Sequence, residues 1–431
     1  MAKVELLSPA GTLEKLKIAF DFGADAVYGG VSHFSLRIRS GKEFSWEDFA
    51  EGIAYAHERG KKVYATLNGF PFNSQLSLLK KHILKMAELK PDAFIVATPG
   101  VLKLCHDLVP DMPLHLSTQA NVMNVLDAQI YQEMGATRII TAREISLKDL
   151  VAIKKELPDL ELEVFVHGSM CFAYSGRCLI STLQSGRVPN RGSCANDCRF
   201  EYEIYAANPE TGTLFKLEED EGIGTHIMNS KDLNLASHMK EILDSGVVDS
   251  VKIEGRTKTA YYAATTAKAY TMAINDYYEG TFDDEKYQYE LQSLQNRGYT
   301  DAYLVSRPFE KHDTQSLDFS MQLGTHQVSG VTNAEGSHFL CKFKTMPDNE
   351  LEVVFPLGSD VAIVDNDIGQ TYERDGKFYM KFKQLKAKNG KIYEEIHSGN
   401  TNAIELPTSF PSYTFFRIPS NINMGTNPLS K

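Results

Sequence analysis

Four of the six cysteines in this 431-residue chain lie in one short segment. They are Cys171, Cys178, Cys194 and Cys198, with the spacing C-x6-C-x15-C-x3-C. Thiolate sulfur is a soft ligand, so four thiolates in one segment can enclose a soft metal centre. Six cysteines are too few for a disulfide-rich secreted protein, and clustered thiols in a reducing cytosol are more often metal-bound or catalytic than paired. The segment therefore predicts a cofactor and redox chemistry.

The spacing favours an iron–sulfur cluster over structural zinc. Zinc sites usually combine two tight cysteine pairs, whereas only Cys194 and Cys198 are closely spaced here. Glycines around the first pair would let backbone amides approach sulfide, and such hydrogen bonds tune the potential of a cluster. Zinc and ordinary buried thiols are the alternatives. Cys105 and Cys341 stand alone in apolar contexts, and we expect both in the core.

Basic side chains accompany the cysteines. Arg177, Arg187, Arg191 and Arg199 stand in this segment against a single acid, Asp197. The whole chain carries a net charge of -11 and has a pI of about 5.6, which argues against a nucleic-acid footprint over the entire surface. A local basic patch is compatible with these values, and scattered solvent-exposed arginines are the alternative.

Up to about residue 256 the chain alternates short apolar runs with amphipathic stretches. The runs are near-continuous, as in strands buried on both faces, and strand–helix alternation gives right-handed crossovers in a parallel sheet. We predict an α/β fold whose strands close into a (β/α)8 TIM-like barrel, with an open doubly wound sheet as the alternative. The predicted strands are residues 4–11, 25–30, 61–70, 93–100, 114–121, 138–146, 162–170 and 248–256.

The pattern changes after the predicted barrel. Residues 257–310 have a helical, tyrosine-rich pattern, and short alternating runs with turn signals begin near residue 320. These runs predict a small antiparallel β-barrel-like domain. We therefore assign residues 1–315 to the barrel, including the cysteine-rich iron–sulfur segment 167–200 and a helical extension, and residues 320–431 to a C-terminal β-domain.

Polar residues at the ends of the predicted strands are candidates for catalysis, because barrel enzymes work at the C-terminal ends of their strands. Glu254 is a general base, a binder of substrate hydroxyls or, most simply, an ion-pair partner of Arg256. His167, four residues before Cys171, is a metal ligand, an acid–base group or a structural residue. The cysteine segment begins at the end of the seventh run, so we expect the cofactor at the barrel mouth. The candidate catalytic residues are Glu254, His167 and Arg143.

No apolar run approaches the roughly 20 residues that span a bilayer. The first residues, MAKVELLSPAGTLEKL, contain no apolar core of a signal peptide. We therefore expect a cytoplasmic protein without a membrane partner.

From Glu163 to Ser181 the chain reads EVFVHGSMCFAYSGRCLIS. This stretch resembles the signature of the collagenase-like peptidase family of unassigned catalytic type. The segments ELLSPAG, GADAVYGG, TQANVMN, TAREIS, VKIEGR and NRGYTDAYL also resemble that family. The resemblance covers nearly the whole chain and implies a barrel followed by a small β-domain.

Within that family, the closing segment NRGSCANDCRF at 190–200 is similar to the iron–sulfur branch that hydroxylates tRNA without oxygen. The resemblance implies that the four clustered cysteines hold a 4Fe–4S cluster. It also implies 5-hydroxyuridine at the tRNA wobble position as the product and prephenate as the hydroxyl source. The implied partners are tRNA, a small carboxylated metabolite and a homologous partner subunit.

This function suggests roles for the arginines. Arg177, Arg191 and Arg199 would meet tRNA phosphates, and Arg143 or Arg256 would hold the carboxylated metabolite by bidentate contacts. The candidate substrate-binding residues are therefore Arg177, Arg191, Arg199 and Arg256, while Arg143 stays among the candidate catalytic residues.

The family name implies an alternative function, a peptidase acting on collagen or other unfolded proteins. The sequence contains no HExxH and no GxSxG. A thiolate that ligates a cluster is not free to attack a carbonyl. A non-catalytic partner of another modification enzyme is the third hypothesis.

Overall fold

The computed structural model describes residues 3–31, 34–36, 43–216, 228–306, 314–316 and 321–420. Contacts divide the chain into two compact units. The first unit comprises residues 1–20, 24–288 and 296–322, and the second comprises 21–23, 289–295 and 323–431. Residues 317–320, where the sequence predicts a junction, and residues 421–431 lie outside the described part of the chain.

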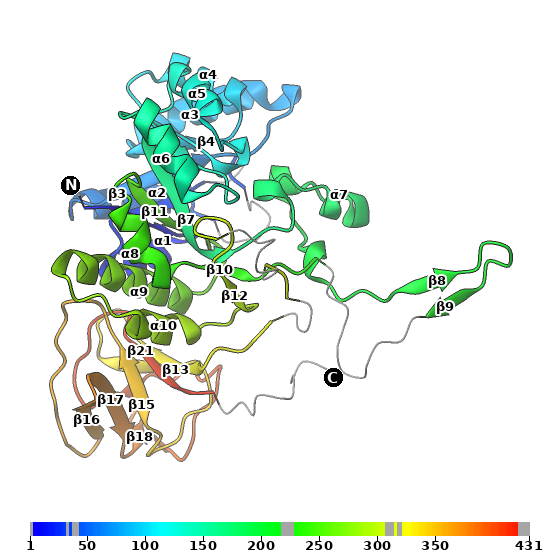
Figure 1. Cartoon of the computed structure of the whole chain (residues 1–431). Coiled ribbons are helices and arrows are strands. Elements are labelled where there is room, and N and C mark those ends of the chain that lie inside the picture. Colours follow the sequence, from blue (N-terminus) through cyan, green and yellow to red (C-terminus); the bar gives the residue numbers. More distant parts are fainter. Residues whose placement is uncertain are drawn as a thin grey trace. The chain divides into compact units, whose positions relative to one another are not determined.

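Parallel strands of the first unit form a closed barrel (Figure 1). Strand β11 closes it, because Ser250 pairs in parallel with Glu5 of β1 on one side and with Glu163 of β7 on the other. The predicted (β/α)8 TIM-like barrel is therefore confirmed, and the open sheet is excluded. The barrel strands are β1 (Glu5–Pro9), β2 (Ala26–Gly29), β3 (Lys62–Leu67), β4 (Ala93–Val96), β5 (Leu114–Leu116), β6 (Arg138–Ile140), β7 (Glu161–Ser169) and β11 (Ser250–Ile253).

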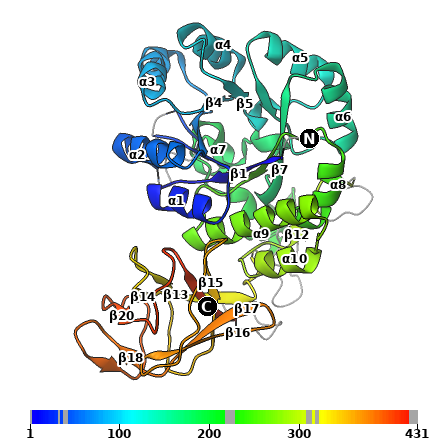
Figure 2. The ribbon, with the colours of Figure 1, turned by 90° about the vertical axis from the view of Figure 1, so that its left-hand side faces the viewer.

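Helices surround the strands of the barrel (Figure 2). Several begin at a side-chain cap supplied by the preceding loop: Ser45, Thr98, Asn124 and Ser146 each accept a hydrogen bond from the backbone N–H three residues later. The helices are α1 (Leu13–Asp21), α2 (Trp46–His57), α3 (Leu76–Glu88), α4 (Pro99–Leu108), α5 (Val125–Glu133), α6 (Leu147–Glu156), α8 (Met239–Asp244) and α9 (Ala260–Glu279).

The first unit also contains elements that the apolar runs do not predict. Strand β10 (Asp232–Asn234) adds to the barrel by pairing antiparallel with the end of β7, with Asn234 opposite His167, and β12 (Tyr299–Thr300) pairs with β10. The cysteine segment contains the short helix α7 (Ile180–Ser185) and leads to a separate hairpin of β8 (Tyr205–Ala207) and β9 (Leu214–Lys216). Helix α10 (Asp284–Gln292) follows α9 within the predicted helical region, and its residues from 289 onward belong to the second unit.

The interior of the barrel holds charged side chains, contrary to the expectation of purely apolar strands. Arg138 Nη1 lies 2.6 Å from Glu5 Oε1 and 3.1 Å from Glu163 Oε2. Lys252 Nζ lies 2.9 Å from Glu163 Oε1, and the Tyr64 hydroxyl donates to Glu5 over 2.7 Å. An unpaired buried charge is strongly destabilising, and this network gives each charge a partner. Lys252 of this network also lines a pocket at the C-terminal ends of the strands.

The second unit contains an antiparallel sheet with the strand order β16-β17-β15-β21-β13-β14-β20. Phe339, Phe382 and Phe416 pack in its core. One predicted run, residues 359–366, forms no strand, and its Val364 instead accepts a backbone hydrogen bond from Thr371. The strands are β13 (His326–Thr332), β14 (His338–Cys341), β15 (Leu351–Val354), β16 (Gly369–Arg374), β17 (Lys377–Phe382), β18 (Leu385–Lys386), β19 (Ile392–Tyr393), β20 (Ile404–Glu405) and β21 (Phe415–Pro419).

Candidate functional site

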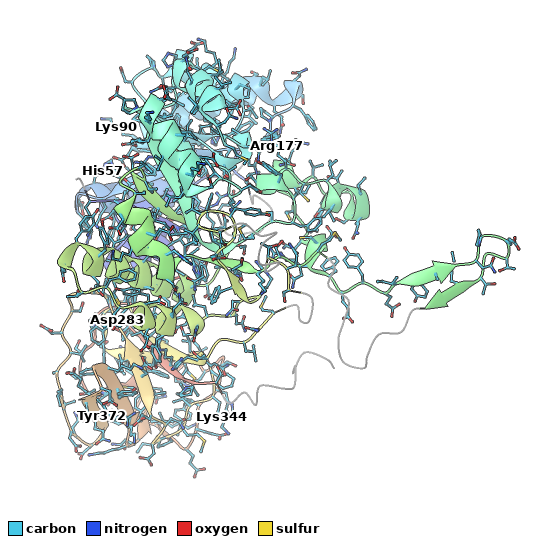
Figure 3. All side chains as sticks on the ribbon, in the orientation of Figure 1. His57, Lys90, Arg177, Asp283, Lys344 and Tyr372 are labelled. Atoms are coloured by element: carbon cyan, nitrogen blue, oxygen red, sulfur yellow. The ribbon has the colours of Figure 1, made fainter. Side chains whose placement is uncertain are left out.

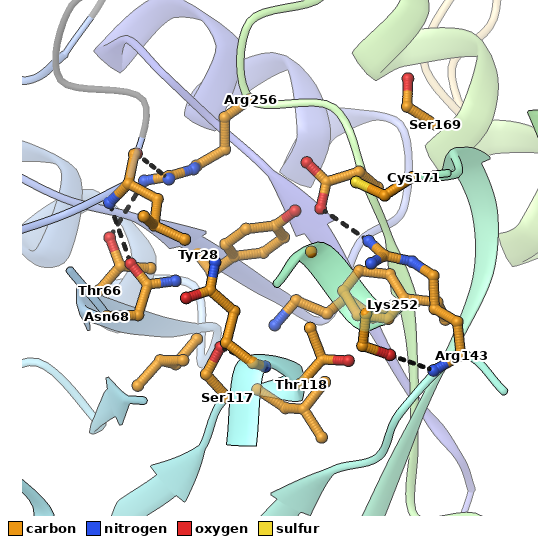
Figure 4. A pocket seen from close by; sticks show the side chains of 18 residues that line it. Tyr28, Thr66, Asn68, Ser117, Thr118, Arg143, Ser169, Cys171, Lys252 and Arg256 are labelled. Atoms are coloured by element: carbon orange, nitrogen blue, oxygen red, sulfur yellow. Dashed lines mark hydrogen bonds and ion pairs between the residues drawn. The ribbon is translucent and has the colours of Figure 1, made fainter. Parts of the chain in front are cut away.

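A pocket of about 90 Å³ opens at the C-terminal ends of the barrel strands (Figure 4). Four residues predicted from strand ends and from the cysteine cluster line it together, although they are far apart in the sequence. They are Arg143, Cys171, Glu254 and Arg256. The barrel topology brings them together, because parallel strands deliver their C-terminal ends to the same face.

Arg143 and Glu254 form the ion pair of this pocket. The guanidinium Nη2 lies 3.4 Å from the carboxylate Oε2, and the same guanidinium stacks 4.0 Å over the centre of the Phe165 ring. The predicted pairing of Glu254 with Arg256 is wrong. Arg256 instead donates to the hydroxyls of Ser35 and Thr66, over 2.6 and 3.1 Å. Ser35 follows β2 and Thr66 lies near the end of β3, and the long arginine side chain reaches across to both.

A glycine lets the ends of β7 and β11 approach closely. Gly168 has a φ of +110°, and a Cβ at this position would lie 2.5 Å from the carbonyl oxygen of Glu254. The hydroxyl of Tyr262 donates to that same carbonyl oxygen over 2.7 Å. Any larger residue at 168 would separate Glu254 from the strand that leads into the cysteine segment.

His167 lies outside the residues that line the pocket. Its side chain is buried, with Nδ1 3.4 Å from the hydroxyl of Tyr270 and the rings of Tyr262 and Tyr299 nearby. Burial, together with the positive charge of Lys258, lowers the pKa of His167 to about 3. The imidazole is therefore neutral and packed among tyrosines, and its catalytic role remains a prediction.

The four clustered cysteines are free thiols and are each half-buried. Burial raises the pKa of Cys198, and the electrostatic influence of Cys171, Cys194 and Cys178 raises it further, while Arg199 opposes them. All three other thiols thus lie within electrostatic range of Cys198. Within the described ranges, no group of three or more His, Cys, Asp or Glu side chains is close enough to hold a metal ion. The thiols converge without forming a closed coordination site.

The surroundings of the thiols fit an anionic cluster. Arg199 Nη2 donates to the carbonyl oxygen of Met170 over 3.3 Å, but Arg199 Nη1 is buried without a hydrogen-bond partner in the part of the chain that the structure describes. Arg297 is within electrostatic range of Cys198 and Cys171. Soft donors, nearby cations and an unsatisfied buried N–H are what a thiolate-bound cluster with sulfide acceptors requires.

The other two predicted phosphate-binding arginines differ in burial: Arg177 is exposed and Arg191 is half-buried. Arg177 is exposed (Figure 3), and its Nε donates to the backbone carbonyl of Gln119 over 2.9 Å. Arg191 stacks 3.7 Å over the ring of Phe72 and donates to Gln75 over 3.1 Å. Both side chains are held in place by the barrel and present cationic groups beside the cysteine segment.

Sequence reasoning missed Lys252, which also lines the pocket. Lys252 Nζ lies 4.2 Å over the centre of the Tyr28 ring, and burial lowers the pKa of this ammonium group. Strand alternation could have identified Lys252, because it lies two residues before Glu254 and thus on the same face. Gln119, near the end of the predicted strand 114–121, also lines the pocket, and it lies on a short 3-10 turn, Thr118–Ala120, instead of on a strand.

Among the described residues, no helix has both the length and the apolar character needed to cross a bilayer.

Comparisons with known proteins assign the chain to a family. The profile of peptidase family U32 matches residues 11–314. A Helicobacter pylori protein described as tRNA hydroxylation protein P is 57% identical over 417 residues, 97% of this chain and 99% of that relative. An Escherichia coli protein described as a 23S rRNA 5-hydroxycytidine synthase is 34% identical over 273 residues, 63% of this chain and 39% of that relative.

A third relative has a different description. A Porphyromonas gingivalis protein described as collagenase is 28% identical over 316 residues, 70% of this chain and 74% of that relative. The match to the family profile spans the barrel from α1 onward and the whole cysteine segment. The chain belongs to peptidase family U32.

Proposed function

We propose that this protein hydroxylates tRNA and that its product is 5-hydroxyuridine at the wobble position. The observation that carries the proposal is the 57% identity, over 99% of the relative, to a protein described as acting in tRNA hydroxylation. A second relative is described as making 5-hydroxycytidine, the same modification on the other RNA pyrimidine. A tRNA substrate would place the reaction in the cytoplasm.

The proposed cofactor is a 4Fe–4S cluster held by Cys171, Cys178, Cys194 and Cys198. The free state of these thiols, their mutual electrostatic influence and the unsatisfied Nη1 of Arg199 support this assignment. When bound, such a cluster supplies one-electron chemistry beside the pocket. The backbone N–H of Ile180 lies 3.4 Å from the sulfur of Cys178 and would stabilise its thiolate.

The chain's own residues would bind and orient the substrates. Lys252 and the Arg143–Glu254 pair line the pocket next to Cys171, so a small carboxylated metabolite such as prephenate would find cations there. Arg143 would have to exchange part of its contact with Glu254 for the carboxylate. Arg177 and Arg191 would bind tRNA phosphates outside the pocket, which explains how an acidic protein attracts RNA.

Peptidase activity has weaker support. The relative described as collagenase is only 28% identical. Cys171 lines the pocket, but no histidine is among the described residues that line it, so the thiol lacks the base that activates a cysteine nucleophile. A role as a non-catalytic partner of another modification enzyme is the remaining alternative.

The nucleosides of tRNA test the proposal. Wild-type protein, but not the Cys171→Ser variant, should restore 5-hydroxyuridine to tRNA in a strain from which the gene is deleted. A tRNA profile that is the same with and without the gene would overturn the proposal. Full restoration by the Cys171→Ser variant would instead support the non-catalytic subunit role.

A further inference from the structure

One buried polar atom in the wall of the barrel-mouth pocket lacks a hydrogen-bond partner among the described residues. The side-chain oxygen Oε1 of Gln119 is buried and has no hydrogen-bond partner among the residues that the structure describes. Gln119 is only 7% exposed, and it lines the pocket together with Cys171. A buried acceptor without a donor costs free energy, so its retention calls for a ligand.

The backbone of Gln119 is held firmly, so the missing contact is not the result of a loose loop. Its N–H donates to the hydroxyl of Ser117 over 3.4 Å, and its carbonyl oxygen accepts from Arg177 Nε over 2.9 Å. The N–H of Ser117 in turn donates to the carbonyl of Val96 on β4 over 2.6 Å. The barrel therefore positions the carboxamide of Gln119 in the pocket wall.

The neighbouring polar side chains already have protein partners. Thr118 Oγ1 donates to the carbonyl oxygen of Thr141 over 2.8 Å, and Lys252 pairs with Glu163. What Gln119 Oε1 lacks is a donor. Carboxylate and phosphate groups offer only acceptors, so the donor to this oxygen must be an N–H or O–H group of a substrate.

We propose that Gln119 recognises the uracil base of the RNA substrate after the base has been turned out of its stack. This inference rests on the proposed function and names the residue that reads the base. Uracil presents an imide N–H flanked by two carbonyl oxygens, and a carboxamide is its complement. Oε1 accepts from the imide N–H, and the side-chain nitrogen donates to one of the carbonyls.

The dimensions and location of the pocket fit one base. A volume of about 90 Å³ holds roughly six or more water molecules, which is the scale of a single pyrimidine ring, so the base and the carboxylated metabolite would occupy the pocket in turn. Enzymes that act on a base inside a stacked structure must extrude it into such a pocket. Cys171 in the same wall would bring the ring next to the proposed cluster.

Aromatic side chains at the rim would hold the flanking nucleotides. Phe172 is 50% exposed and Tyr174 is 48% exposed. They adjoin Cys171 and Ser175, both of which line the pocket. Exposed aromatic rings stack with unpaired bases, and the exposed Arg177 adds a phosphate contact at the same rim.

The test pairs a change in the protein with a change in the base. Full-length protein purified without oxygen is titrated with an anticodon stem–loop RNA that carries either uridine or 3-methyluridine at the wobble position. The methyl group removes the imide N–H. Wild-type protein should bind the uridine RNA roughly tenfold more tightly than the methylated RNA, and Gln119→Ala should reduce this preference to near unity.

Two further variants control the measurement. Gln119→Glu keeps the acceptor and nearly the same shape but loses the donor, so it should weaken binding of the uridine RNA roughly tenfold. Gln129→Ala, on α5, removes an exposed glutamine whose side chain donates a hydrogen bond to Glu133, and it should bind both RNAs as wild type does.

The outcomes separate this inference from the proposed function. Binding of RNA with the same base preference in wild type and in Gln119→Ala overturns the role of Gln119 alone. Failure of the wild-type protein to bind either RNA overturns the proposed function, and the inference with it.

Discussion

Arg143 and Glu254 face each other across the barrel mouth with 3.4 Å between guanidinium and carboxylate, although 111 residues separate them in the chain. The pair comes from the ends of β6 and β11, and Phe165 of β7, the strand between them, supports the guanidinium from one side. The carboxylate is thereby fixed beside Cys171 with its charge balanced. An acidic substrate that approaches the guanidinium of Arg143 would therefore find the carboxylate of Glu254 already beside it.

Removing one member of this pair should lower both activity and stability, and removing both members should separate the two effects. Glu254→Gln or Arg143→Met should lower hydroxylation by roughly tenfold or more, since each removes a group that orients substrate. Each single variant should also lower the free energy of unfolding by roughly 1–3 kcal/mol, because the remaining charge loses its partner. The double variant should regain the thermal midpoint without regaining product. Nucleoside analysis and thermal denaturation check both, and wild-type product in both single variants would contradict the assignment.

Gly168→Ala should disturb the site through the backbone. The added Cβ would meet the carbonyl of Glu254, and the φ of +110° is unfavourable for alanine, so the expected cost is roughly 1–3 kcal/mol with loss of bound iron. Gly186→Ala is the matched control, because Gly186 also has a positive φ but nothing within 4 Å. Equal thermal midpoints and iron contents in the two variants would show that the contact with Glu254 is unimportant.

Because His167 is buried and neutral, we expect the free energy of unfolding to fall as the pH becomes acidic. Its folded-state pKa of about 3 lies below the roughly 6.5 of an unfolded histidine, so the unfolded chain binds more protons between these values. The contribution of neutral His167 is complete above about pH 6.5 and is lost as the pH falls toward 3. Urea denaturation of wild type and His167→Gln should show that the variant loses less stability on acidification. Parallel pH profiles would contradict the neutral buried state.

Because Arg177 and Arg191 are proposed to contact phosphates, we expect RNA binding to weaken as the salt concentration rises. Arg177→Gln and Arg191→Gln should each reduce the slope of log K against log salt concentration by roughly 0.7, the value for one phosphate contact on a single strand. Arg59→Gln is the control, because Arg59 follows α2 and stacks over Tyr55 away from the predicted site. A slope that changes in the control as much as in the two variants would remove these arginines from the interface.

The sequence predicts the barrel well because burial on both faces leaves an apolar run for each strand. It also predicts which residues reach the mouth, since Arg143, Glu254 and Arg256 follow such runs. Which residues pair there depends on the order and stagger of the strands around the barrel. That is why Glu254 pairs with Arg143 rather than with its near neighbour in sequence.

Other features have no local signal. His167 pairs with tyrosines from α9 and β12, which only tertiary packing brings to it. The orphaned oxygen of Gln119 can be recognised only when the hydrogen bonds of the whole pocket are known. The four cysteines, in contrast, stand out in the sequence by their spacing, and their role as cluster ligands remains a prediction.

The metal content of the purified protein tests the central claim most directly. Full-length protein prepared without oxygen should contain iron and acid-labile sulfide in near-equal amounts. Replacing any one of Cys171, Cys178, Cys194 and Cys198 by serine should lower both, while Cys341→Ser, in the second unit, should leave them unchanged. A colourless protein that contains only zinc, or iron that is retained when these cysteines are replaced, would contradict the account.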